Sequence, residues 1–125
     1  MQTGIPFKNN SNKIRKMEMT KIIKRQIREL SGLLYERELN AELAKLDAHF
    51  EQWRQGSLSP FDLAEYIHEF HQKPARELFS KFSYADSFPM LVAKGIVDGA
   101  LSGEEVPADI KEALASWIAL FESNK

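Results

Sequence analysis

Apolar residues recur at helical spacing over most of this chain. From Ile22 to Phe121 they return every three or four positions, the period of an amphipathic α-helix, and no segment alternates apolar with polar residues as a half-buried strand does. The 125 residues are enough for one domain with a single core. The pattern predicts an all-α fold, a small helical bundle of five to six helices formed by residues 20–125 as a single domain.

Two apolar stripes near the start of this pattern point in opposite directions. The first consists of Ile23, Ile27, Leu30 and Leu34, and the second runs from Leu39 to Trp53. At about 100° per residue, the two stripes lie on nearly opposite faces of one helix. Either the chain breaks near Ser31-Gly32, or one long helix offers two faces to two partners. In the second case we expect another molecule, for example a second copy of this chain, to cover the first stripe.

The clearest predicted boundaries are those of the third helix, which follows the two stripes and is expected from about Ser59 to Gln72. Ser59 suits the N-cap, Pro60 suits the first helical position, and Gly56 suits the end of the preceding helix. Because a proline restricts the residue before it, we expect this helix to end near Gln72 and Pro74 to open a short fourth helix.

The C-terminal third of the chain predicts two further helices. The segment 89–101 is apolar nearly all round, which is typical of a central helix, and its Gly95 and Gly99 would let a neighbour approach closely. Ser102 and Glu105 form a capping box. The last helix is expected to run from about Pro107 to Phe121.

Charge is segregated along the chain, although the formal net charge is only −1. Residues 1–28 hold eight basic residues and one acidic residue, a net charge of +7, and the remaining residues sum to −8. We interpret residues 1–19 as a disordered basic N-terminal arm, and we treat Met1, Met17 and Met19 as three candidate translation starts. Such an arm would bind a polyanion, dock on an acidic body, or remain solvated.

Composition excludes several classes of protein. There is no cysteine, which excludes disulfides, thiolate metal sites and cysteine nucleophiles. No apolar run is long enough to cross a bilayer, and the N-terminus lacks the apolar stretch of a secretory signal. We therefore expect a cytoplasmic protein without a membrane span.

The third helix carries the best candidate for a chemical site. Glu65 and His68 form an E-x-x-H unit, and His71 follows one turn later. A carboxylate and an imidazole three residues apart share a metal ion in helical di-iron proteins, but such sites use the unit twice. Only one unit occurs in this chain. A metalloprotein or hydrolase that uses Glu65, His68 and His71 is therefore a minor alternative, and we expect no cofactor.

A second candidate site is the cationic face of the first helix. Phosphate binding requires several cations on one face, and this helix supplies Lys21, Lys24, Arg25 and Arg28. No aromatic residue lies between the cations, so we do not expect base stacking on this segment. Electrostatic binding of nucleic acid is the second functional hypothesis.

The leading hypothesis is a small, non-enzymatic helical protein that works by protein–protein contact. We expect it to bind a protein partner or to form a homodimer through the stripe of Ile23, Ile27, Leu30 and Leu34, because the rest of the sequence pattern does not evidently cover that stripe.

Overall fold

The computed structural model describes the backbone of residues 4–125 and the side chains of residues 20–125. The regular secondary structure of these residues is all helical, with no strand, which confirms the predicted all-α fold class. The elements are α1 (Gly4–Arg54), α2 (Pro60–Phe70), the π-helix η1 (His71–Ala75), α3 (Arg76–Lys81), the 3₁₀-helix η2 (Ala85–Ser87), α4 (Phe88–Asp98), α5 (Ala108–Ala113) and α6 (Ala115–Ser123).

The basic arm expected over residues 1–19 falls outside the residues whose side chains are described. Residues 1–3 lie outside the described residues altogether, and the backbone from Gly4 on is assigned to α1. The predicted disorder and charge role of this arm stay predictions.

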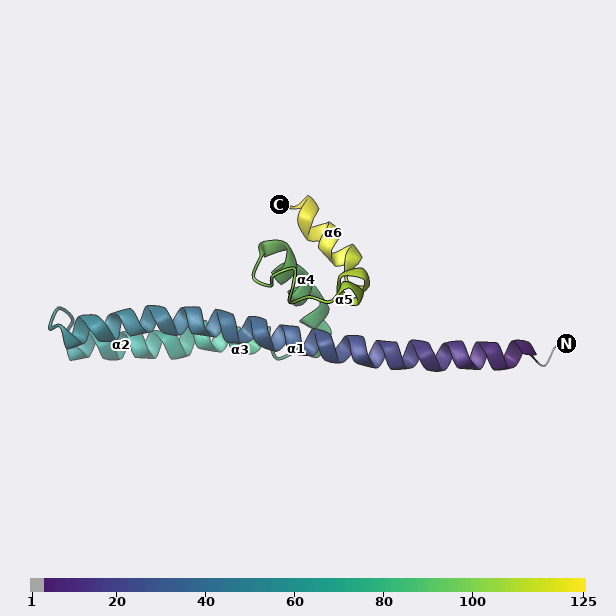
Figure 1. The fold of residues 1–125 in the computed structure, drawn as a ribbon. Coiled ribbons are helices and arrows are strands. Elements are labelled where there is room, and N and C mark those ends of the chain that lie inside the picture. The colour runs from purple at the N-terminus through teal and green to yellow at the C-terminus, as the bar shows by residue number, and fades with distance from the viewer. Residues whose placement is uncertain (1–3) are drawn as a thin grey trace.

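Helix α1 decides between the two alternatives for the opposed stripes. It is a single helix of 51 residues that continues through Ser31 and Gly32 without a break. Figure 1 shows α2 and α3 running back along one half of this rod, while α4, α5 and α6 gather near its middle. One long helix therefore offers its two faces to two different parts of the same chain.

The first stripe lies inside the main core of the molecule. Ile27, Leu30 and Leu34 are buried among residues of the later helices, and Ile23 packs against the edge of this cluster. The core also contains Leu78, Phe82, Leu91, Val92, Ala93, Leu101, Val106, Ile110 and Leu114. The expectation that another molecule covers this stripe is corrected, because α4 and α5 of the same chain cover it.

Helix α4 is the central helix that its composition predicts. It packs on both α1 and α6, and its Val92 and Ala93 are fully buried. Gly95 lets α1 approach, because a Cβ atom at this position would lie 2.8 Å from Leu34 Cδ2. Gly99 does not serve close approach; it ends α4 in the left-handed conformation at φ 81°, which glycine adopts without strain.

Helix α2 begins as its sequence predicts. Ser59 is the N-cap, and its Oγ accepts a hydrogen bond from the Asp62 backbone N at 3.0 Å, with Pro60 in the first turn. Gly56 has a φ of 80°, so it supplies the left-handed residue that ends α1 and starts the turn. The second half of α1 runs antiparallel to the continuous rod of α2, η1 and α3, and the two rods form a two-helix hairpin, hereafter the hairpin.

The predicted break at Pro74 is wrong. Helix α2 continues through η1 into α3, and Pro74 lies inside the π-helical turn instead of opening a new helix. Proline has no N–H and its ring clashes with the carbonyl four residues earlier in a regular α-helix. In this chain the proline lies in a π-helical turn, and the rod continues past it.

The C-terminal part is joined to α1 by a charged pair. Arg37 donates to both carboxylate oxygens of Glu105 and, through Nη1, to the carbonyl oxygen of Ala100 at 2.6 Å. Glu105 also accepts from the Ser102 backbone N at 2.8 Å, which confirms the predicted capping box. These hydrogen bonds, first that from Arg37 and then that from Ser102, lower the pKa of Glu105 to about 2.

The final helix is shorter than expected. The predicted segment from Pro107 to Phe121 is divided into α5 and α6, which meet at Leu114 with a φ of −102°. Leu114 itself is buried in the core. The change of direction therefore lets α5 pack on α1 and α6 pack on α4.

Candidate functional site

The most prominent cavity of the described residues is an apolar groove along the hairpin, hereafter the hairpin groove. It lies between α1 and the η1–α3 segment and has a volume of about 570 Å³. Its lining residues are Tyr35, Leu39, Leu43, Phe70, His71, Gln72, Ala75, Arg76 and Phe79. Most of them are apolar, so the groove is suited to another apolar surface and not to a charged ligand.

The groove exists because the hairpin has only two helices. Two helices bury one seam between them and leave the sides of their apolar stripes uncovered. Leu63 is buried in this seam, whereas Leu43 is 42% exposed and Phe79 is 65% exposed. The second apolar stripe of α1 is therefore only partly buried by the rest of the chain.

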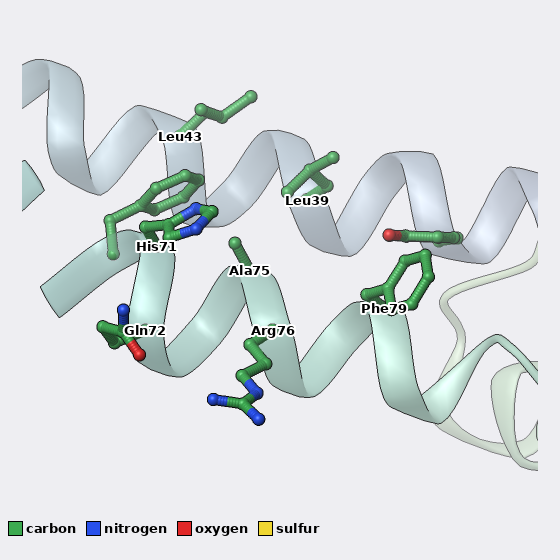
Figure 2. Close-up of a pocket in the computed structure, with 9 residues that line it drawn as sticks. Leu39, Leu43, His71, Gln72, Ala75, Arg76 and Phe79 are labelled. Atoms are coloured by element: carbon green, nitrogen blue, oxygen red, sulfur yellow. The ribbon is translucent and has the colours of Figure 1, made fainter. Parts of the chain in front are cut away.

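Figure 2 shows how the lining side chains are arranged. Leu39 and Leu43 project from α1 on one rim, and Gln72 and Arg76 project from the other helix on the opposite rim. Ala75 faces α1 across the floor of the groove, where its small side chain leaves space. Beside the groove, the ring of Tyr35 stacks on Phe82 with the centroids 5.0 Å apart, which anchors this end to the core.

The other side of the hairpin is polar. A smaller hollow there is lined by four charged residues, Glu42, Lys45, Glu69 and Lys73, together with Leu46, His49, Tyr66, Phe70 and Pro74. His49 stacks on Tyr66 with centroids 3.6 Å apart and has Gln52 Oε1 at 3.4 Å from its Nδ1. Charged side chains are more numerous around this hollow than around the groove, so the two sides of the hairpin are hereafter called the charged face and the apolar face.

The candidate metal residues are not brought together. Glu65 and His68 are exposed on α2, and His71 lies on the groove. Among residues 20–125 no group of three or more His, Asp or Glu side chains is close enough to hold a metal ion. His49 is engaged with Tyr66 on the charged face, so the histidines of the hairpin do not converge on one cleft.

The four cations predicted to share one face of α1 do lie on one exposed side of the helix. Lys21, Lys24, Arg25 and Arg28 are all exposed, and their spacing of three, four and seven residues places them on one side of the helix. Ile27 and Leu30, on the opposite side, are buried in the core. Lys24 and Arg28 also border a small hollow of about 310 Å³ that includes Asp86.

Sequence reasoning missed the groove, although part of its signal was available. Leu78, Phe79 and Phe82 are apolar residues of one short segment. Leu78 and Phe82 are four residues apart, so they share one face of the helix, and both are buried in the core. Phe79 therefore points to the side, onto the groove. A two-helix hairpin has more apolar residues here than its single buried seam can hold. This excess is the sequence signal for an exposed apolar site.

Comparisons with protein-family models, curated proteins and solved structures found no match to this chain. Within residues 20–125, no helix has a stretch both long and apolar enough to cross a membrane.

Proposed function

We propose that this protein works through protein–protein contact, as a non-enzymatic helical protein whose contact surface is the apolar face of the hairpin. The observation that carries the proposal is the hairpin groove, with Leu43 and Phe79 exposed on it. A contiguous apolar surface of this kind is costly to leave in water and is typical of an interaction site.

The arrangement favours contact over catalysis. The groove is lined mainly by apolar side chains. Gln72 and Arg76 lie on its rim, and His71 also lines it, but its lining includes no carboxylate that could work with this imidazole. General acid–base chemistry needs a titratable group within hydrogen-bond reach of a substrate in a site that excludes water. A rim of this type instead orients a partner while the apolar floor supplies the binding energy.

The experiment is site-specific photo-crosslinking in living cells. A photoreactive phenylalanine analogue replaces Leu43, and a control variant carries it at Phe61, which is 83% exposed but does not line the groove. We expect adducts from position 43 to a protein identified by mass spectrometry, and few from position 61. Equal and weak crosslinking from both positions would contradict the proposal.

Electrostatic nucleic-acid binding is a second candidate, supported by the cationic face of α1. Lys21, Lys24, Arg25 and Arg28 share that face, which is free of the core. If each neutralises one phosphate, the logarithm of the affinity for duplex DNA falls with the logarithm of salt concentration with a slope of about −3.6.

Fluorescence anisotropy with a duplex oligonucleotide at several salt concentrations tests this second candidate. Changing all four residues to glutamine should abolish binding, whereas the control variant Lys45→Gln/Lys73→Gln, on the charged face of the hairpin, should bind as the wild type does. No measurable binding at low salt would remove nucleic acid as a partner.

A further inference from the structure

We propose that the partner of the hairpin groove is a second copy of this chain, and that two hairpins pack face to face as a four-helix bundle. The inference rests on the proposed function and deepens it by naming the partner. Two helices with one apolar face are half of such a bundle, and a second copy brings the matching half in the same shape.

The side chains on the groove suit helix packing. Leu39 and Leu43 lie one turn apart on α1, and Ile67, which is 41% exposed, precedes the groove residue His71 by one turn on α2. Ala75 supplies a small residue between the large ones. Alternation of large and small side chains on facing helices allows them to interdigitate at an interaxial distance of roughly 8–10 Å.

The face is large enough for a stable dimer. The arm of α1 from Tyr35 to Arg54 is about 30 Å long at 1.5 Å per residue, and two helices side by side are about 20 Å wide. The face is therefore about 600 Å² on each copy, or about 1,200 Å² in total, which exceeds the roughly 1,000 Å² that a specific interface requires. This area is at the lower end of stable dimers, so the dimer should dissociate on dilution.

The charges on the two rims of the groove are complementary. On α1, Glu36 and Asp47 lie in one row with Leu43, seven residues before it and four residues after it. Arg54 follows Asp47 by seven residues in the same row and lies 3.9 Å from it, so it offsets the charge of Asp47. Glu36 is exposed to solvent. On the opposite rim, Arg76 forms no ion pair with the residues whose side chains are described.

These rim charges select one orientation of the two copies. A two-fold axis parallel to the helices places each α1 over the partner's α3, so that Glu36 meets the partner's Arg76. A two-fold axis perpendicular to the helices would stack α1 on α1 and leave Glu36 away from the partner's Arg76. We infer the first arrangement, with the two α1 helices parallel.

Sedimentation velocity and equilibrium of the full chain over a wide concentration range test the inference. We expect a mass that rises toward twice the 14.3 kDa of one chain. Phe79→Glu should weaken the dimer at least about 30-fold, the effect of a central interface residue. The control Phe61→Glu removes a more exposed phenylalanine that is absent from the groove lining, so it should leave the dimer unchanged.

A charge exchange provides a second test that does not depend on the stability of Phe79→Glu. Glu36→Arg and Arg76→Glu should each weaken the dimer, and the double variant should restore it. A wild-type chain that stays monomeric at about 100 μM, or dissociation by Phe61→Glu as strong as by Phe79→Glu, would overturn the inference. If the dimer is overturned but position 43 crosslinks to a different protein, the proposed function stands. If position 43 gives no adduct at all, both the dimer and the proposed function are refuted.

Discussion

The crossing of α4 over α1 makes a sharp prediction about two glycines. Gly95 lies under Leu34, and a Cβ atom added to Gly95 would be 2.8 and 2.9 Å from the two terminal carbons of Leu34. Gly32 also lies within a helix, but a Cβ atom there would have no heavy atom within 4 Å. Gly95→Ala and Gly32→Ala therefore make the same chemical change in a crowded and in an open environment.

The expected magnitudes follow from two opposing effects. Replacing a helical glycine by alanine stabilises the helix by up to about 1 kcal/mol, which is the whole effect expected for Gly32→Ala. At Gly95 the added methyl group must displace Leu34, which is only 4% exposed, and such overpacking costs about 1–3 kcal/mol. The free energy of unfolding of Gly95→Ala should thus lie about 1–3 kcal/mol below that of Gly32→Ala.

Urea denaturation followed by circular dichroism, at one fixed protein concentration, measures this difference. A double-mutant cycle with Leu34→Ala adds specificity, because the methyl group added by Gly95→Ala would then occupy part of the space that Leu34 leaves. The two changes should be less destabilising together than the sum of the single effects, by about 0.5–3 kcal/mol. Equal stabilities for Gly95→Ala and Gly32→Ala, with no coupling to Leu34, would refute the packing of α4 on α1.

Three further predictions follow from local contacts. Ser31 is 1% exposed and its Oγ has no hydrogen-bond partner among the described residues, so Ser31→Ala should raise the unfolding free energy by about 1 kcal/mol in the same urea assay. Ser59→Ala removes the N-cap of α2 and should lower that free energy by about 1 kcal/mol, measured by thermal and urea denaturation. Because the folded pKa of Glu105 is about 2 and its ordinary value is 4.5, ionised Glu105 stabilises the fold above about pH 4.5, and this contribution is lost as the pH falls toward 2. Denaturation at pH 7 and at pH 3 should therefore show a smaller loss of stability for Glu105→Gln than for the wild type; an equal loss would contradict the role of the Arg37–Glu105 pair.

The features that the sequence predicts correctly are those decided within a few residues. The N-cap at Ser59 and the capping box of Ser102 and Glu105 each depend on a side chain three positions from the backbone group it meets. Gly56 ends α1 for an equally local reason, its left-handed φ of 80°. Such contacts need no knowledge of the rest of the fold.

The features that the sequence does not predict depend on tertiary context. Periodicity shows that Ile27, Leu30 and Leu34 form an apolar face, but it does not show that α4 and α5 return to cover it. A proline normally ends a helix, whereas Pro74 lies inside η1, and both η1 and α3 stay packed along α1. The groove escapes prediction for the same reason, because its existence depends on which faces find a partner.

The continuity of α1, one rod whose two faces belong to different parts of the molecule, underlies both the core and the groove. Since the chain has no cysteine, Arg25→Cys and Ala48→Cys provide two unique, exposed sites for spin labels. Pulsed electron spin resonance, on labelled protein diluted with unlabelled protein, measures the distance between them. A continuous helix predicts one narrow distribution near 35 Å between the labelled backbone sites, from about 1.5 Å per residue. A distribution centred well below this value, or spread over many distances, would show a break near Gly32 and contradict a continuous α1.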